Sequence, residues 1–225
     1  MAWVQRNSHL TTEETRNNGE IVASFFLAQG WNKTSVGALC GCMQQESQIN
    51  PQLWEEGMPE WGDNTGYGLV QWTPATRLVE KAEVWHLGNY QDGTVQLNVL
   101  LGEYNTTNSD LAEWFPRSGW NMSFYDWAHN TQGLDANTLA YYFVNNYLRP
   151  FDPVNPNYGT YAVQWAQYIE SGTFPDVPTP GPTPGPGPTP PGPTPGKPID
   201  FKQPWTMLLL KGYNGRRQRV YYGRR

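Results

Sequence analysis

Two stripes of apolar side chains at helical spacing open the chain: Ile21, Val22, Phe25 and Phe26, then Val36, Leu39, Cys40 and Met43. The first stripe predicts a helix that begins at a T-x-x-E capping box at Thr11 and ends at Gly30. The second predicts a helix that is capped by Asn32 or Thr34 and runs through Ser47. Both helices are amphipathic, so each is expected to pack one face against a core.

Beyond the stop at Asn50-Pro51, the pattern changes. Between Trp54 and Trp72 the chain is dense in Gly, Trp, Asp and Asn without a helical period, which predicts turns and a short two- or three-stranded ribbon. A third helix is expected to start with Thr73 as N-cap and Pro74 at the first helical position. Further helices are predicted over Thr94 to Tyr104, Ser109 to Phe115, Asp135 to Leu148 and Thr160 to Ser171, the last stopped by Gly172. The predicted fold class is α+β: a mainly helical domain with a small β-ribbon.

Composition divides the chain into three parts. Twelve of the 20 prolines and six glycines lie between residues 172 and 198, and such a segment cannot build a core. We therefore expect a globular domain at residues 1–173, a linker at 174–198 and a basic, aromatic tail at 199–225. The longest mostly apolar run, Ile21 to Ala28, is eight residues, too short to cross a bilayer. The N-terminal residues show no secretory signal pattern, so we expect synthesis in a cytoplasm.

Charge is unevenly distributed. Residues 1–195 carry 7 Lys and Arg against 19 Asp and Glu, a formal charge of −12, whereas residues 196–225 carry 8 against 1, a charge of +7. An acidic globular domain is a poor nucleic-acid binder, because affinity for phosphate backbones depends on neutralising their charge. The basic tail could bind a partner protein, a wall polymer or a polyanion, or it could be a disordered solubilising segment.

The two cysteines, Cys40 and Cys42, point about 200° apart on their helix and should not pair with each other. Buried, reduced thiols are the expected state. A catalytic cysteine served by His86 or His129 is the alternative, although nothing in the sequence links either histidine to Cys40. The scattered histidines show no ligand spacing, so neither a metal nor another cofactor is predicted.

Glu46 is the strongest candidate for chemistry. It lies at the edge of the second apolar stripe, three residues after Met43, and in the last turn of its helix. Desolvation and the negative end of the helix dipole both disfavour its ionised form, and a carboxyl that stays protonated near neutral pH is a general acid. The alternatives are an exposed glutamate or one paired to Arg77 or Arg149.

The aromatic, Gly-rich segment that follows contains Trp54, Trp61, Tyr67 and Trp72. Flat aromatic faces can stack on sugar rings, and glycines let the backbone approach a ligand. The same rings could instead pack in the core. The segment therefore favours a carbohydrate cleft without assigning any single ring to it.

Three segments carry a resemblance to a known family: GWNKTSVGALCGCMQQESQINP (30–51), GYGLVQWTPATR (66–77) and YYFVNNYLRP (141–150). Over roughly residues 17–171 the chain resembles the phage tail lysozyme family, within the lysozyme and lytic-transglycosylase superfamily. Glu46-Ser47 looks like the catalytic glutamate motif, and Gly68-Leu69-Val70-Gln71 looks like the Gly-Leu-x-Gln cleft motif. Cys42 departs from the Asn that relatives tend to carry.

The resemblance implies a substrate, the β-1,4-linked N-acetylmuramic acid and N-acetylglucosamine glycan of bacterial peptidoglycan. Glu46 would protonate the glycosidic oxygen, and Asp63 is the first candidate for stabilising the developing positive charge, followed by Glu60, Glu55 and Glu56. Many relatives manage with a single glutamate, and Asp63 could be a turn residue only. Gln71, Thr73, Tyr67 and Trp72 are the expected substrate-binding residues.

The resemblance also implies a place of action. We expect a virion-borne enzyme that rides on the phage tail and opens the host wall at the start of infection, with the basic tail anchoring it to a structural protein. A soluble endolysin that acts at lysis is the first alternative. A glycan-binding tail protein without chemistry and an amidase or endopeptidase are the others. The sequence itself does not decide whether water or the muramic acid 6-hydroxyl attacks the sugar. The resemblance favours water, and so a lysozyme-type glycoside hydrolase (muramidase), with a lytic transglycosylase as the alternative.

Overall fold

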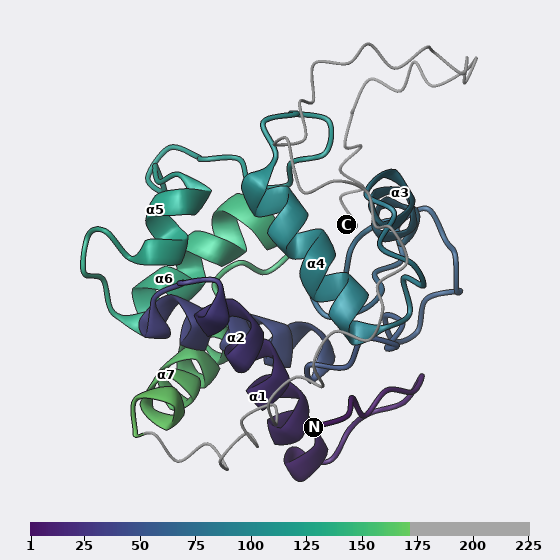
Figure 1. Cartoon of the computed structure of the whole chain (residues 1–225), viewed down its shortest axis with the longest axis horizontal. Helices are drawn as coiled ribbons and strands as arrows, with labels where there is room; N and C mark the ends of the chain where they lie inside the picture. Colours follow the sequence, from purple (N-terminus) through teal and green to yellow (C-terminus); the bar gives the residue numbers. More distant parts are fainter. Residues whose placement is uncertain (172–225) are drawn as a thin grey trace, which may run out of the picture. The chain divides into compact units, whose positions relative to one another are not determined.

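The structure is a computed structural model that describes residues 1–171. The predicted stop at Gly172, the linker and the basic tail lie outside these residues. Within the described part the helices are α1 (Thr12–Ala28), α2 (Lys33–Ser47), α3 (Thr76–Val84), α4 (Gly93–Asn105), α5 (Phe124–His129), α6 (Ala136–Phe143) and α7 (Asn157–Glu170), and a short π-helix, Val144–Leu148, continues α6. Figure 1 shows α2 among α1, α6 and α7, with α3 beside α4.

The first two helices begin as their sequences predict. Thr11 Oγ1 accepts a hydrogen bond from Glu14 N at 3.2 Å, and Glu14 Oε2 accepts one from Thr11 N at 2.8 Å, which completes the capping box of α1. Asn32 Oδ1 accepts from Thr34 N at 2.8 Å and caps α2. Since each cap satisfies amide groups within its own turn, local sequence is enough to place these helix starts.

Two helix predictions were wrong. Helix α3 begins at Thr76, three residues after the expected cap, because Thr73 Oγ1 donates to Gln71 O at 2.9 Å instead of accepting from the helix. Residues 109–115 form turns and extended chain rather than a helix, because Phe115 N pairs with Asn146 O at 2.9 Å. The short helix α5, capped by Ser123, lies where no helix was predicted.

The mainly helical character of the predicted fold is confirmed. The expected ribbon between Trp54 and Trp72 consists only of isolated antiparallel bridges, Trp54–Tyr67 and Tyr67–Trp72, and residues 1–171 contain no longer strand. Positive φ angles at Gly57, Gly68 and Gln71 turn the chain, so the backbone hydrogen bonds do not continue into paired strands. The β component of the α+β class is therefore limited to bridges in the described part of the chain.

Helices α2 and α7 pack along each other at a seam of small residues. A Cβ atom at Gly37 would lie 2.6 Å from Ala166 Cα, and one at Gly41 would lie 2.3 Å from Ala162 N. No side chain fits at either glycine, so the two backbones approach unusually closely. Tyr158 lies one turn before Ala162 on the same face of α7, and the seam therefore carries it towards the C-terminal end of α2.

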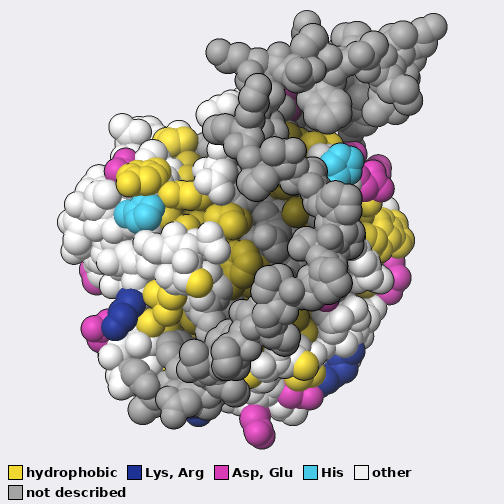
Figure 2. Space-filling view, in the orientation of Figure 1, with side chains coloured by type: hydrophobic (Ala, Val, Ile, Leu, Met, Phe, Trp, Pro, Cys, Tyr) yellow, Lys and Arg dark blue, Asp and Glu magenta, His cyan; other side chains and the backbone are white. Residues whose placement is uncertain are grey.

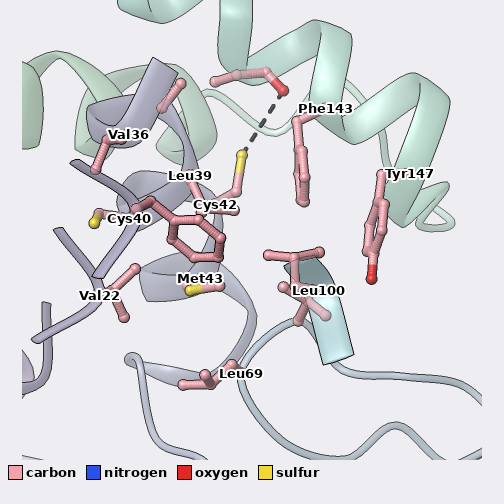
Figure 3. Packing of buried hydrophobic residues seen from close by; sticks show 14 of the residues in the cluster. Val22, Val36, Leu39, Cys40, Cys42, Met43, Leu69, Leu100, Phe143 and Tyr147 are labelled. Atoms are coloured by element: carbon pink, nitrogen blue, oxygen red, sulfur yellow. Dashed lines mark hydrogen bonds between the residues drawn. The ribbon is translucent and has the colours of Figure 1, made fainter. Parts of the chain in front are cut away.

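The core surrounds α2. Figure 3 shows Leu39, Cys42 and Met43 of α2 packed with Phe143 of α6 and Leu100 of α4. Both cysteines are buried and unpaired, as predicted, and the Cys42 thiol lies 3.7 Å from its acceptor, Ala140 O. Burial raises the pKa of each thiol, so neither is a reactive thiolate. This finding argues against a catalytic cysteine.

None of the helices within residues 1–171 has the length and apolar character needed to span a bilayer. On the face seen in Figure 2, Lys and Arg side chains are few, and acidic side chains are scattered around the visible surface. This distribution agrees with the acidic composition of the globular part.

Candidate active site

Glu46 lies at the C-terminal end of α2, where the helix borders a cleft of about 560 Å³. Three helices and two connecting segments contribute to the cleft. Its walls include Arg16 of α1, Gln44 and Gln45 of α2, Leu53 of the following loop, and Trp165 and Tyr168 of α7. The cleft thus provides polar amides and aromatic rings beside a single glutamate, a lining suited to a sugar polymer.

The environment of Glu46 favours its protonated form. Burial raises the pKa of Glu46 to about 7, even though a hydrogen bond from the Tyr158 hydroxyl to Oε1 opposes the shift, and the nearby charge of Glu55 adds to it. Tyr158 is itself buried and comes from α7. A carboxyl with a pKa near neutrality, open to a cleft, has the protonation state that a general acid requires.

The two arginines that could have neutralised Glu46 are engaged elsewhere. Arg77 Nη1 lies 2.6 Å from Glu113 Oε1, and Arg149 Nη2 lies 2.8 Å from Glu113 Oε2. Glu113 thus binds both guanidinium groups. Among the residues of the described domain, the hydrogen-bond partner of the Glu46 carboxyl is the neutral Tyr158 hydroxyl rather than a cation.

A buried serine joins the two sequence motifs. Ser47 Oγ lies 3.0 Å from Leu69 O and 3.1 Å from Met43 O, so it bridges the last turn of α2 and the Gly68–Gln71 segment. The amide of Asn50 also approaches Ser47 Oγ, at 3.3 Å. The residue beside the candidate acid therefore positions the cleft motif that lies 22 residues away in the chain.

The Gly68–Gln71 segment is a braced turn. Gly68 has a φ of 78°, and a Cβ atom there would lie 2.5 Å from Gln96 Oε1 of α4. The same oxygen accepts from Leu69 N at 2.9 Å, while Gln71 Nε2 donates to Leu53 O and Gly68 O, both at 3.1 Å. These bonds fix the backbone at this point, and the amide nitrogen of Gln71 contributes to the turn.

The other predicted site residues occupy different environments. Tyr67 and Trp72 are buried in the core, and Trp72 Nε1 donates to Glu103 Oε1 at 3.2 Å. Asp63 and Thr73 are exposed. Tyr67 and Trp72 thus pack behind the turn, and Asp63 and Thr73 lie at the surface. Neither these four residues nor Gln71 is among the residues that line the cleft of Glu46.

Exposed aromatic surface near the turn comes from a different set of rings. Trp61 is 50% exposed, and its ring centroid lies 5.0 Å from that of Trp54 and 5.8 Å from that of Tyr90. Tyr67 packs beneath them, 4.5 Å from Trp54. This cluster presents an aromatic face to solvent, as the composition of the segment suggested.

A buried ionic cluster lies beside Trp72, the residue that follows the Gly68–Gln71 segment. Lys81 of α3 contacts Glu103 of α4 and lies 3.0 Å from Glu113 Oε1, and the Tyr147 hydroxyl donates to Glu103. Trp72 joins the cluster through Glu103. Because an unpaired buried charge is costly, these contacts hold α3, α4 and the π-helix in a fixed arrangement.

Sequence reasoning missed Tyr158. The residue is separated from Glu46 by 112 positions, and no motif marks it, because its role depends on how α7 packs on α2. It lies two residues before the last predicted helix, which in the structure begins earlier, at Asn157, and takes in Tyr158. Glu55 was ranked below Asp63 and Glu60, yet its charge contributes to the raised pKa of Glu46.

Comparison with known families identifies the class of protein to which this domain belongs. A model of phage tail lysozyme matches residues 17–169, and the chain belongs to this family. Among curated proteins, Morphogenesis protein 1 of Bacillus phage B103 is 34% identical over 161 residues. The aligned region covers 71% of this chain and 41% of that relative, so the chain spans less than half of the relative's length.

Proposed function

We propose that the protein is a phage glycosidase that cleaves the β-1,4 bond between N-acetylmuramic acid and N-acetylglucosamine in peptidoglycan. One observation carries the proposal: a cleft-lining carboxyl, Glu46, whose pKa is raised by burial to about 7. Family membership supports a lysozyme-like activity and makes peptidoglycan the substrate to test. The raised pKa supplies the acid that such an activity requires.

In the proposed reaction, Glu46 transfers its proton to the glycosidic oxygen as the bond to the anomeric carbon breaks. Positive charge develops on the sugar while the Glu46 carboxylate is formed. The Tyr158 hydroxyl donates to Oε1 and stabilises that carboxylate, so it would make proton release easier. Burial works in the opposite direction and keeps the proton in place before substrate binds.

A second carboxylate would stabilise the developing positive charge or orient water. Asp63 remains a candidate because it is exposed. Glu55 is better supported, since its charge reaches Glu46 and its Oε2 accepts from Gly66 N at 2.9 Å, which holds it beside the cleft motif. Separate Asp63→Asn and Glu55→Gln variants would decide between them, because only the residue that contacts the transition state should lower kcat strongly.

For substrate binding we propose Gln71, Thr73 and the exposed face of the aromatic cluster around Trp61. Thr73 has an exposed hydroxyl, and the half-exposed Trp61 ring can stack on a sugar. Tyr67 and Trp72 would contribute indirectly by supporting the turn. Trp61→Ala should therefore raise KM for long glycans more than it changes kcat.

The nucleophile is a separate question. Attack by water gives a reducing muramic acid end, whereas attack by the muramic acid 6-hydroxyl gives an anhydro end. Membership of a lysozyme family favours water. Mass spectrometry of the digestion products distinguishes the two ends, and release of free amines instead would indicate an amidase or endopeptidase.

We further propose that the protein is carried by the virion and opens the host wall at the start of infection. The family's description as a tail lysozyme and a relative named as a morphogenesis protein both favour this over a soluble endolysin. The tail at residues 199–225 would bind a structural protein of the phage. Mass spectrometry of purified particles tests the location: absence of the protein from particles would favour the endolysin.

Zymography with purified peptidoglycan tests the catalytic proposal. Wild type should clear the gel, and Glu46→Gln should not, because the amide cannot donate a carboxyl proton. Glu80→Gln is the matched control, since Glu80 is an exposed glutamate of α3 outside the cleft, and this variant should clear the gel as wild type does. Equal clearing by wild type and Glu46→Gln would reject the assigned acid, and absence of clearing by wild type would favour a glycan-binding tail protein.

A further inference from the structure

The cleft that contains Glu46 extends along α7 to Arg16 of α1. Among the described residues that line it, Arg16 is the one Lys or Arg side chain, and Glu46 is the one carboxyl group. The globular part of the chain is strongly acidic. The permanently charged group in this cleft is nevertheless a cation, the Arg16 guanidinium. A local cation in such a domain favours an anionic ligand at that point.

Arg16 is held in place from one side. Its Nε and Nη2 atoms lie 2.9 Å and 2.6 Å from the Tyr168 hydroxyl, and Nε lies 3.4 Å from Glu20 Oε1. The Glu20 side chain is only 5% exposed, whereas that of Arg16 is 55% exposed. No acceptor among residues 1–171 contacts Nη1. The guanidinium is thus oriented by the buried Glu20 and the half-buried Tyr168, with an edge left for a ligand.

Helix α7 gives the spacing between this group and the candidate acid. Tyr158 contacts Glu46 and Tyr168 contacts Arg16, and ten residues of helix correspond to a rise of about 15 Å. A cation close to Glu46 would lower its pKa, and Arg16 is not among the groups that shift it. A ligand group bound at Arg16 therefore lies away from the glycosidic bond that is cleaved at Glu46. It would be a substituent farther along the polymer.

We propose that Arg16 forms an anion subsite of this cleft that binds a carboxylate of the peptidoglycan strand. The inference rests on the proposed function, because it takes the cleft to be the glycan site. Two parts of the polymer carry such a group: the peptide stem, and the lactyl group of a muramic acid that has lost its peptide. A fixed guanidinium edge suits either carboxylate, since charge-assisted hydrogen bonds from arginine are short and directional.

Glu20 limits the strength of the subsite. Its carboxylate lies on the buried side of Arg16 and offsets part of the positive charge, while the ligand would approach from the exposed side. The guanidinium would lie between the two carboxylates, so attraction by Arg16 outweighs the more distant repulsion by Glu20. We therefore expect an effect of about tenfold, typical of one charge-assisted hydrogen bond at a partly exposed site.

The test compares three substrates: native sacculi, sacculi whose carboxyl groups have been amidated with carbodiimide and ammonia, and glycan stripped of peptides by an amidase. Wild type should cleave native sacculi with a kcat/KM about tenfold above that of Arg16→Gln, and the two should be equal on amidated sacculi. Lys33→Gln is the matched control, because Lys33 is also 55% exposed and in a surface ion pair but lies outside the cleft. It should behave as wild type throughout.

The stripped glycan identifies the source of the carboxylate. If the difference between wild type and Arg16→Gln is seen on native sacculi and disappears on stripped glycan, the peptide stem supplies it. If the difference appears on stripped glycan, the lactyl group supplies it. An equal loss for Arg16→Gln on native, amidated and stripped substrates would overturn the proposal and leave Arg16 a structural role, and so would the absence of any loss.

Binding separates this proposal from that of catalysis. In the Glu46→Gln background, co-sedimentation with native sacculi should weaken about tenfold when Arg16→Gln is added, and amidation of the sacculi should remove that difference. This result would stand even if wild type proved inactive as a glycosidase. Unchanged co-sedimentation on adding Arg16→Gln would reject the subsite. An Arg16→Lys variant, which keeps the charge, should recover part of the binding if the subsite is electrostatic.

Discussion

The Tyr158 hydroxyl donates a hydrogen bond to Glu46 Oε1 from a helix 112 residues farther along the chain. This bond lowers the pKa of Glu46, whereas burial and the charge of Glu55 raise it. The balance leaves the pKa at about 7. The side chain can therefore hold its proton at neutral pH and still release it, and the predictions below test the parts of this arrangement.

Replacing Tyr158 with Phe should move the alkaline limb of the activity profile to higher pH. The variant lacks the hydrogen bond that stabilises the carboxylate, so the pKa of Glu46 rises and the acid form persists to higher pH. The measurement is kcat/KM against pH. Tyr141→Phe, which loses a 3.3 Å hydrogen bond to Asn155 O, is the control and should leave the profile in place. Identical profiles for wild type and Tyr158→Phe would contradict the proposed tuning.

Glu46 should reduce stability as the pH rises. Its pKa is about 7 in the folded protein against an ordinary 4.5, so the folded state binds its proton more tightly, and the stabilisation present below pH 4.5 is lost as pH rises through 7. In Glu46→Gln this loss is absent. Between pH 5 and pH 8, the free energy of unfolding of wild type should therefore fall by about 2 kcal/mol relative to that of Glu46→Gln. Urea titrations at both pH values measure it, and a constant difference would show that Glu46 titrates normally.

Ser47→Ala should reduce activity more than its loss of stability explains. The change removes the bond to Leu69 O, leaves that buried carbonyl unpaired and frees the Gly68–Gln71 turn, at a cost of about 1–2 kcal/mol. Ser35→Ala is a matched control on the same helix, since Ser35 Oγ is buried and lies 2.6 Å from Trp127 O, away from the cleft. Both variants should lower the unfolding midpoint similarly, and only Ser47→Ala should lower kcat. Equal activities at a temperature where both are folded would remove the positioning role.

Gly68→Ala should destabilise the protein more than Gly57→Ala. Both glycines have a positive φ, 78° and 76°, so alanine is strained at either site by about 1 kcal/mol. A Cβ at Gly68 also meets Gln96 at 2.5 Å, whereas one at Gly57 meets nothing within 4 Å. Thermal unfolding should show the larger drop in midpoint for Gly68→Ala. A comparable drop in both variants would show that Gln96 adapts and that only backbone strain matters.

Local signals carried the sequence predictions that were confirmed. The caps at Thr11 and Asn32 act within one turn, and the apolar stripes of α1 and α2 fix which face is buried. The same stripe indicated that Glu46 borders the core. Position relative to a helix face is readable from sequence because it depends only on helical periodicity.

Contacts between distant residues decided the rest. The expected helix over residues 109–115 does not form, because Glu113 is drawn to Lys81 and Arg149 and Phe115 pairs with Asn146. The composition of residues 54–72 could not tell which rings face solvent, and Trp72 lies in the core because its indole reaches Glu103. The roles of Tyr158 and Glu55 depend equally on tertiary packing.

The glycine seam between α2 and α7 has a consequence for engineering the protein. Replacing Gly37 or Gly41 with alanine is a standard way to strengthen a helix, yet here it would wedge the two helices apart. The widened spacing would withdraw the Tyr158 hydroxyl from Glu46 and so alter the acidity of a group that neither glycine touches. Thermostabilisation of this domain should therefore start elsewhere, because these two positions support the Tyr158–Glu46 contact as well as the helix packing.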